Sequence, residues 1–184
     1  MIELETHGAV RVLRMREGEN RFNRASIDAI HTALDEVTST DGPVALVTVG
    51  DGKFFSNGLD LEWMGGDGAG DDTFLGDVHR MLLRVLRLDV LTVAAINGHA
   101  FAGGAMLATA HDVRIMRDDR GYWCLPEVDL GLPLTPEMFF VLDAHLPRAA
   151  MADASLTGRR YSGPEALLAG IVHELVTEDA LLGR

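Results

Sequence analysis

The sequence predicts an α/β fold, because segments typical of strands alternate with segments typical of helices along the chain. Continuous apolar runs at residues 44–49 and 91–96 are typical of buried strands. Apolar side chains recur every three or four residues over 26–38 and 73–88, which indicates amphipathic helices. The chain has 184 residues and shows no repeat or linker, so we expect a single domain over residues 1–184.

The first half of the chain is expected to begin with two strands and a helix. Residues 2–6 and 9–15 alternate apolar and polar side chains, with a turn near Gly8. The helix over 26–38 follows, with Ser26 as its expected cap. After the strand at 44–49, a glycine-rich loop leads to residues 65–72, which contain only Gly, Asp and one Ala and are expected to form a mobile surface loop.

In the second half, the strand at 91–96 leads into another glycine-rich loop and a helix of small residues ending at His111. Strands are expected at 112–116 and 122–125, helices at 136–145, 147–156 and 163–169, and a last strand at 171–176. The stretch 126–134 is expected to be non-helical, because proline lacks a backbone donor and Gly131 weakens regular structure.

Charge and composition narrow the classes of function. The chain carries 28 acidic residues against 16 Lys and Arg, a net charge of −12, which argues against nucleic acid or an anionic membrane as partner. The seven histidines show no metal-binding spacing, and Cys124 is the single cysteine. No apolar stretch has the length that spans a bilayer, and the N-terminus lacks signal-peptide features. We therefore expect a bacterial cytoplasmic protein that binds no metal.

Glu127 is the first candidate for chemistry. It lies among apolar residues, glycine and proline, where desolvation would raise the pKa of its carboxyl. A carboxyl with a raised pKa can act as a general base near neutral pH. The alternative is an ordinary solvated glutamate in a surface loop. Asp129 would share a face with Glu127 in an extended segment and raise that pKa further, although a loop-capping acid or a surface ion pair is the simpler interpretation.

Two loops, at 56–60 and 97–104, each follow an apolar segment and are rich in small residues. Such loops bring backbone N–H groups close to a ligand. Gly103 also begins a helix, whose first N–H groups have no internal acceptor. Two donors from separate loops could form an oxyanion hole. Taken singly, each loop is better explained by tight turns and close helix packing.

Together with Glu127, these loops resemble the crotonase, or enoyl-CoA hydratase/isomerase, superfamily. The segments are residues 54–61 (FFSNGLDL), 94–104 (AAINGHAFAGG) and 126–131 (PEVDLG). Within the family, EVDLGLPL and AHDVRIMR look most like plant-type Δ3,Δ2-enoyl-CoA isomerases. The resemblance implies a crotonase (ClpP-like) spiral of repeated ββα units, with two roughly perpendicular sheets flanked by helices. It also implies a homotrimer or hexamer, with C-terminal trimerisation helices that are short or absent because the sequence stops at Arg184.

The resemblance implies a role for each matching residue. The N–H groups of Leu59 and Gly103 match the pair that binds the thioester carbonyl of an acyl-CoA, and Glu127 matches the glutamate that moves the proton. No cofactor is implied beyond coenzyme A, which is part of the substrate. Arg21, Arg24 and Lys53 are candidates, from charge alone, to contact the CoA phosphates. The implied substrate-binding residues are Ser56, Asn57, Gly58, Leu59, Asp60, Leu61, Gly103 and Met106, and Asp60 is also expected to cap the helix that it precedes.

Position 106 decides the expected reaction. Hydratases of this family have a second glutamate there, and dienoyl-CoA isomerases place acids there and at the position of Thr135, but this chain has Met106 and Thr135. A 1,3 proton shift needs a single base, so the resemblance implies a Δ3,Δ2-enoyl-CoA isomerase of fatty-acid β-oxidation. Met106 is expected to form an apolar wall of the acyl pocket, or else only to pack within its helix. Hydration, thioester hydrolysis and non-catalytic acyl-CoA binding stay open as alternatives.

Overall fold

The computed structural model describes residues 1–183 and confirms the α/β class, with two separate sheets. Only the pair β1–β2 is antiparallel; the other pairs are parallel. The large sheet contains, in spatial order, β1 (Ile2–His7), β2 (Val10–Met15), β3 (Ala45–Gly50), β5 (Leu91–Ile96), β7 (Val113–Arg117) and β9 (Glu174–Val176). The small sheet contains β4 (Phe54–Ser56), β6 (His99–Phe101) and β8 (Trp123–Cys124).

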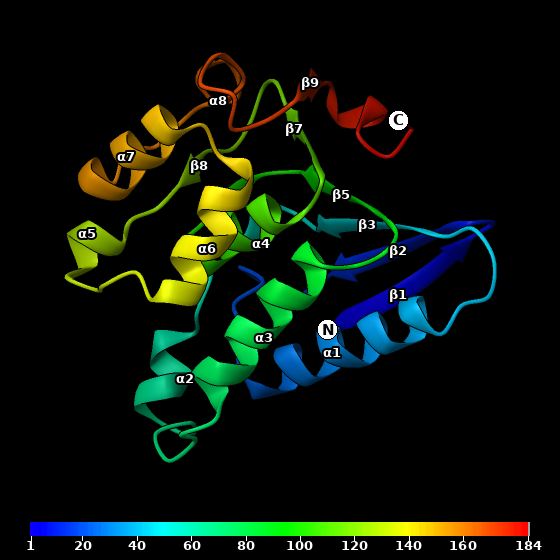
Figure 1. Ribbon diagram of the computed structural model, residues 1–184, viewed down its shortest axis with the longest axis horizontal. Coiled ribbons are helices and arrows are strands. Elements are labelled where there is room, and N and C mark those ends of the chain that lie inside the picture. Colours follow the sequence, from blue (N-terminus) through cyan, green and yellow to red (C-terminus); the bar gives the residue numbers. More distant parts are fainter. Residues whose placement is uncertain (184) are drawn as a thin grey trace.

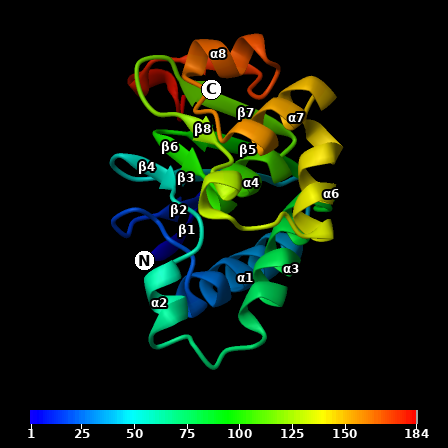
Figure 2. The same ribbon diagram turned by 90° about the vertical axis from the view of Figure 1, so that its left-hand side faces the viewer.

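Helices α1, α3, α4 and α6 lie in front of the large sheet in Figure 1, whereas the turned view in Figure 2 shows α8 above the strands and α2 at the lower end of the molecule. No helix within residues 1–183 is long and apolar enough to cross a membrane. The α-helices are α1 (Arg24–Thr38), α2 (Leu61–Gly65), α3 (Phe74–Leu86), α4 (Gly103–Ala110), α5 (Glu127–Leu130), α6 (Pro136–His145), α7 (Arg148–Thr157) and α8 (Gly163–Leu168), and a 3-10 turn covers Glu178–Ala180.

The chain repeats one unit three times: a strand of the large sheet, a strand of the small sheet, then a helix. These units are β3–β4–α2, β5–β6–α4 and β7–β8–α5. This is the ββα spiral that the family resemblance implied. Strands β4 and β6 pair in parallel, with Ser56 opposite Ala100. The chain therefore leaves both strands at the same edge, and the two glycine-rich loops predicted from the sequence lie side by side.

Helix α4 forms the centre of the molecule, and every one of its residues is buried. It contacts α3 and α6 on one side and the strands β4, β5 and β6 on the other. Small residues permit this close packing, since a Cβ atom on Gly104 would lie 2.2 Å from the carbonyl oxygen of Ser56. The Trp123 indole N–H donates to the carbonyl of Ala105 at 3.3 Å. A helix enclosed in this way holds its N-terminus in a fixed position.

Two buried polar residues secure the other end of α4. Arg114 is 1% exposed, and its guanidinium donates to the carbonyls of His111 at 2.6 Å and Ile171 at 2.7 Å. The His111 ring contacts the Thr48 hydroxyl and the Leu107 carbonyl, each at 2.8 Å. Complete burial lowers the pKa of His111 to about 4, so the ring is neutral at physiological pH. These contacts give His111 a structural role.

Two local predictions were wrong, one about the cap of α1 and one about the short turn α5. Asn23, rather than Ser26, is the N-cap of α1; the Asn23 carboxamide oxygen accepts from the Ser26 N–H while the Ser26 hydroxyl accepts from the Asn23 N–H. The stretch 126–134 is not entirely non-helical, because residues 127–130 form the single turn α5. Pro126 stands before this turn, where no donor is needed, and Gly131 ends it with φ +67°.

Candidate active site

A cavity of about 540 Å³ lies where the spiral brings its loops together. The glycine-rich loops after β4 and β6 form one side, α3 and α4 another, and the segment from Pro126 to Met138 a third. Most of its lining is apolar. The polar or charged side chains that line it are Arg21, Asn57, Glu127, Thr135 and Arg160. An apolar cavity with few convergent polar groups is typical of a site for a small ligand.

Two backbone donors face this cavity from neighbouring loops. Leu59 and Gly103 both line it, and within residues 1–183 the N–H of neither residue has a hydrogen-bond acceptor. A Cβ atom on Gly58, which has φ +77°, would lie 2.7 Å from the Gly103 nitrogen. The two loops are therefore in backbone contact. Two adjacent unpartnered N–H groups can bind one oxygen atom that carries negative charge.

The loop that carries Leu59 is held by buried polar contacts. The Ser56 hydroxyl donates to the Asn20 carbonyl at 2.7 Å and accepts from the Gly58 N–H at 3.1 Å. The Phe22 N–H donates to the Gly58 carbonyl at 2.7 Å. These bonds fix the backbone on both sides of Leu59. Sequence reasoning missed the contribution of Asn20, because it depends on a contact between segments 36 residues apart.

The donor at Gly103 follows a strained residue. Ala102 has φ +51°, a value that residues other than glycine rarely adopt. It is the N-cap of α4, so its conformation sets the direction in which the chain enters the helix. Strained backbone of this kind is concentrated at functional sites, where the surrounding structure enforces it. Here the enclosed helix α4 and the neighbouring Gly58 enforce it.

Glu127 is the only carboxylate that lines the cavity within residues 1–183. It is 8% exposed, and its Oε2 atom has no hydrogen-bond partner. Burial raises the pKa of its carboxyl above the ordinary glutamate value. The alternative in which Asp129 shares a face with Glu127 does not hold, because α5 is helical; Asp129 is an exposed acid that lies against Gly158, closer to the simpler interpretation. Glu127 therefore has the position and burial expected of a general base.

Met106 lines the same cavity and is fully buried, as expected for an apolar wall. Val78, Leu82 and Met138 continue that wall. No acid stands at position 106 to act beside Glu127. The cavity therefore combines one carboxylate and two N–H donors with an extended apolar surface, a combination that can move a proton next to a bound carbonyl group without a second acid.

The other predicted binding residues divide into two groups. Asn57 and Leu61 line the cavity, whereas Ser56, Gly58 and Asp60 stand behind the lining and support it. Asp60 accepts a hydrogen bond from the Trp63 N–H at 3.1 Å, which confirms its predicted capping of α2. No group of metal-binding side chains occurs within residues 1–183. Burial raises the pKa of the Cys124 thiol to about 11, so this thiol is unreactive.

The positively charged side chains that were candidates to contact the CoA phosphates are arranged differently from what the sequence suggested. Arg24 lies 2.7 Å from Asp71 and 2.7 Å from Asp77, so acids of its own chain neutralise it. Arg21 lines the cavity and pairs with Glu19 at 2.7 Å, while the Lys53 ammonium lies over the Phe54 ring. Arg160 was missed by the sequence reasoning, and no local motif marks it. Its guanidinium lies 5.5 Å from the centre of the Phe101 ring, and within residues 1–183 it has no carboxylate partner.

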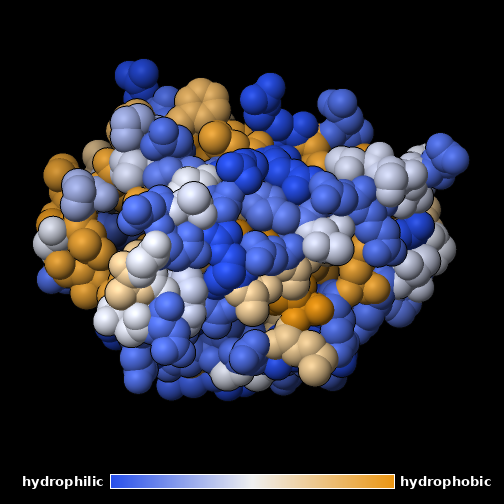
Figure 3. Space-filling model, turned by 90° about the horizontal axis from the view of Figure 1, so that it is seen from below, coloured by the Kyte–Doolittle hydropathy of each residue, from blue (hydrophilic) through white to orange (hydrophobic). Residues whose placement is uncertain are grey.

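An apolar surface adjoins this site. Seen from below, much of the surface is hydrophilic, and apolar atoms gather in several places, among them the left-hand edge, the side on which α5 lies in Figure 1 (Figure 3). Val128, Leu130 and Leu132 are the exposed apolar residues of that segment. Leu130 and Leu132 also line the cavity, so its wall continues to the surface there.

Comparison with known proteins gives a consistent family relationship. A family model described as enoyl-CoA hydratase/isomerase matches residues 5–184. Enoyl-CoA delta isomerase 3 of Arabidopsis thaliana is 38% identical over 192 residues, which cover 98% of this chain and 79% of that relative. A carnitinyl-CoA dehydratase of Citrobacter koseri is 37% identical over 139 residues, covering 76% of this chain and 53% of the relative.

Solved structures agree with the sequence relatives. An enoyl-CoA hydratase/isomerase family protein from Silicibacter pomeroyi superposes with a TM-score of 0.88 at 27% identity, covering 100% of this chain and 78% of that protein. A Mycobacterium tuberculosis protein, described as an enoyl-CoA isomerase in one solved structure and as a probable enoyl-CoA hydratase in another, gives TM-scores of 0.88 and 0.89 at 27% and 26% identity. These matches cover 100% of this chain and 80% and 78% of the two solved chains. The spiral described above is therefore the fold of these proteins.

Proposed function

Because the chain belongs to the enoyl-CoA hydratase/isomerase family, we propose that it is a Δ3,Δ2-enoyl-CoA isomerase acting in fatty-acid β-oxidation. The observation that carries this proposal is the single buried carboxylate, Glu127, in one cavity with the free N–H groups of Leu59 and Gly103. The names of the plant relatives, which are enoyl-CoA delta isomerases, support the same choice.

The reaction needs one base and one oxyanion site. In the proposed mechanism, the Glu127 carboxylate takes a proton from C2 of a 3-enoyl-CoA, and the electron pair moves onto the thioester oxygen. The N–H groups of Leu59 and Gly103 stabilise the resulting enolate. Glu127 then returns the proton at C4, and the double bond forms between C2 and C3. Substrate and product are isomers, so the balanced reaction contains no water, metal or redox partner.

The raised pKa of Glu127 suits this proton transfer. A carboxyl that binds its proton more tightly than an ordinary glutamate is a stronger base when ionised, and it holds the abstracted proton until that proton is returned to carbon. The apolar wall formed by Val78, Leu82 and Met106 would hold the acyl chain and exclude water from the enolate. Exclusion of water favours isomerisation over hydration.

A second candidate is hydration or dehydration of an acyl-CoA. The similarity to carnitinyl-CoA dehydratase favours it. In this reaction Glu127 would act on a water molecule or hydroxyl group rather than on carbon alone. The lack of a second carboxylate among the cavity residues within 1–183 argues for a slow hydration at most. Product analysis separates the two reactions.

The test is a spectrophotometric assay with a trans-3-enoyl-CoA that follows the appearance of the conjugated thioester. We expect turnover in the unaltered protein and a fall of about 10²- to 10⁴-fold in kcat for Glu127→Gln, the usual size of a general-base contribution. Asp129→Asn, an exposed acid of the same turn, is the matched control and should keep its activity. Mainly 3-hydroxyacyl-CoA as product would contradict the isomerase assignment.

The assembly is part of the proposal. A homotrimer or hexamer that binds acyl-CoA thioesters would suit the exposed apolar residues Val128, Leu130 and Leu132 beside the cavity. Light scattering measures the mass directly. A monomer at micromolar concentration would contradict the proposed assembly and leave the isomerase reaction to be judged by its own assay.

A further inference from the structure

A short chain of polar groups leads out of the apolar part of the cavity. Thr135 lines the cavity, and its hydroxyl lies 3.1 Å from Nε2 of His79. Nδ1 of the same ring lies 3.7 Å from Oε2 of Glu137. His79 belongs to α3 and Glu137 to α6, so the three groups also join two helices that flank the cavity.

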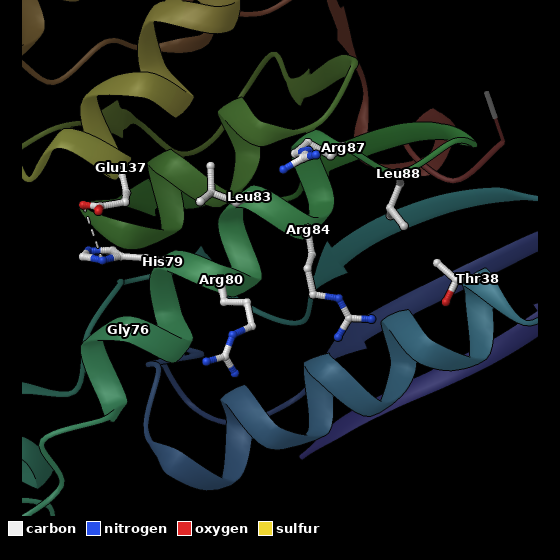
Figure 4. Close-up of a pocket in the computed structure, with 9 residues that line it drawn as sticks. All are labelled: Thr38, Gly76, His79, Arg80, Leu83, Arg84, Arg87, Leu88 and Glu137. Carbon is white, nitrogen blue, oxygen red and sulfur yellow. Dashed lines mark ion pairs between the residues drawn. The ribbon is translucent and has the colours of Figure 1, made fainter.

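His79 separates the cavity from a groove on its other side. The groove, of about 570 Å³, is lined by His79 and Glu137 together with Arg80 and Leu83 (Figure 4). The side chain of His79 is only 13% exposed, whereas that of Glu137 is 45% exposed. Thr135 is thus the inner end and Glu137 the outer end of a polar connection through an otherwise apolar wall.

The hydrogen bonds of the Thr135 hydroxyl leave one lone pair of its oxygen without a donor. The oxygen accepts from the Met138 N–H at 3.3 Å. The carboxylate of Glu137 near Nδ1 favours the tautomer with a proton on that nitrogen, which leaves Nε2 as an acceptor. The hydroxyl proton of Thr135 then points to this outer side, toward Nε2 or the Glu137 carboxylate, which also interacts with the hydroxyl. A hydroxyl oxygen has two lone pairs, so the second one remains available to a donor in the cavity.

From this arrangement we propose that Thr135 is a specificity-determining residue that accepts a hydrogen bond from a hydroxyl group on the acyl chain of the substrate, and that His79 is its positioning residue. The substrate class is therefore a 3-enoyl-CoA with a hydroxyl beyond C4. This inference rests on the proposed acyl-CoA isomerase function. The neighbouring wall residues Val78, Leu82 and Met138 are apolar, so among the cavity residues within 1–183 Thr135 is the hydrogen-bonding side chain on that wall.

The test measures binding of non-reacting, saturated acyl-CoA esters by calorimetry. Each hydrocarbon chain is paired with a chain of equal length that carries a hydroxyl, moved one carbon at a time beyond C4. We expect the hydroxylated ester to bind about 3- to 10-fold more tightly at one or two positions, the size of one added hydrogen bond. Equal affinity at every position would overturn the proposal.

Variants distinguish recognition of the substrate hydroxyl by Thr135 from a purely structural Thr135–His79 contact between α3 and α6. Thr135→Ser should keep the preference, and His79→Leu should lower the affinity for the hydroxylated ester by more than the affinity for the hydrocarbon ester, which removes the preference. His79→Leu is the decisive variant, because it keeps the bond from Met138 to the Thr135 hydroxyl, whereas Thr135→Val also removes the cap of α6. His79→Gln should restore much of the preference, since its amide can replace Nε2.

Two outcomes would show that the contact is only structural. One is an equal loss of affinity for both esters in His79→Leu, and the other is a preference that survives in that variant. The experiment involves no turnover, so it is independent of the isomerase assay. A hydroxyl preference without isomerisation would refute the proposed reaction alone, and isomerisation without a preference would refute this inference alone.

Discussion

Gly58 and Gly103 approach each other so closely that a Cβ atom on Gly58 would lie 2.7 Å from the Gly103 nitrogen. Gly58 also has φ +77°, a conformation that glycine adopts without strain. The two N–H donors of the cavity, at Leu59 and Gly103, are therefore positioned by direct backbone contact. If these donors bind an oxyanion as proposed, the site is preorganised, since no side chain has to move to form it.

Gly58→Ala should disrupt this contact for two reasons, the positive φ and the 2.7 Å approach. We expect kcat to fall about 10²- to 10³-fold, as for the loss of an oxyanion donor, and the free energy of unfolding to fall by about 1–3 kcal/mol. Gly70→Ala is the matched control, because Gly70 has open space around it. Steady-state kinetics and denaturant unfolding measure both effects. Near-normal kcat in folded Gly58→Ala would show that the donors do not depend on this contact.

Glu127→Gln should stabilise the protein at neutral pH while it removes activity. Burial raises the pKa of Glu127 in the folded state, so the folded protein binds this proton more tightly than the unfolded chain does. The contribution of this proton to the free energy of unfolding is fully present below the pKa that Glu127 has in the unfolded chain. It is lost as pH rises through the pKa that Glu127 has in the folded protein. Glu127→Gln has no titrating carboxyl at this position and therefore does not lose stability in this way. Its melting temperature should therefore increase relative to the unaltered protein as pH rises above the ordinary glutamate pKa.

The control for this comparison is Asp129→Asn, which removes one carboxylate from the exposed side of the same turn. A difference in melting temperature that stays constant with pH would contradict the assignment of a raised pKa. The opposite trend, with Glu127→Gln losing stability as pH rises, would indicate that the carboxylate has a partner that the unpartnered Oε2 atom does not suggest.

The pH dependence of the reaction should report the same group. The base must be ionised to take a proton, so kcat/KM should fall on the acid side with a pKa above that of an ordinary glutamate. The residual rate of Glu127→Gln should lack this inflection. The measurement is kcat/KM across the acid range in buffers of constant ionic strength. An inflection retained in the variant would assign it to another group.

The sequence allowed Leu59, Gly103 and Glu127 to be proposed as one site because each lies in a recognisable local segment, and the structure places all three in the lining of one cavity. The glycines around Leu59 and Gly103 mark loops with little side-chain obstruction, and the apolar surroundings of Glu127 mark a buried acid. The turn α5 was missed because four residues are too few to show a helical period. The capping of α1 by Asn23 was missed because Ser26 has the same capping chemistry.

The sequence could not show which charged side chains are free to bind a ligand, because their pairing depends on which segments meet in the folded protein. Arg24 was a candidate for a ligand phosphate, but Asp71 and Asp77 come from distant positions to neutralise it. The pair Thr135–His79 spans 56 positions, and neither residue belongs to a motif. Such contacts follow from the packing of α3, α4 and α6, which periodicity predicts only as separate helices.

Arg114→Lys should lower the free energy of unfolding by about 2–4 kcal/mol, although it keeps the charge. The planar guanidinium reaches the carbonyls of His111 and Ile171 at once, and a single ammonium group cannot reproduce that geometry. Denaturant unfolding measures the effect. Arg148→Lys, at an exposed position, is the control and should change stability by less than about 0.5 kcal/mol. A similar small change for Arg114→Lys would show that the buried contacts are readily replaced.

Arg160→Ala should weaken the binding of acyl-CoA with little effect on kcat. Arg160 lines the cavity without a carboxylate partner in residues 1–183, whereas its neighbour Arg159 pairs with Glu165 at 2.8 Å. A free guanidinium beside an acyl-CoA site is suited to a phosphate group. We expect KM for the CoA thioester to rise about 3- to 30-fold at low salt, with the difference shrinking as ionic strength increases.

The control variant is Arg159→Ala, which removes an adjacent charge of the same kind but one that an acid already neutralises. It should leave KM nearly unchanged. The control substrate is the thioester of the same acyl group with N-acetylcysteamine, which lacks all phosphates; Arg160→Ala should not alter its KM. An equal rise in KM for both thioesters would show that Arg160 acts instead by holding the Phe101 ring, over which its guanidinium lies, in the cavity wall.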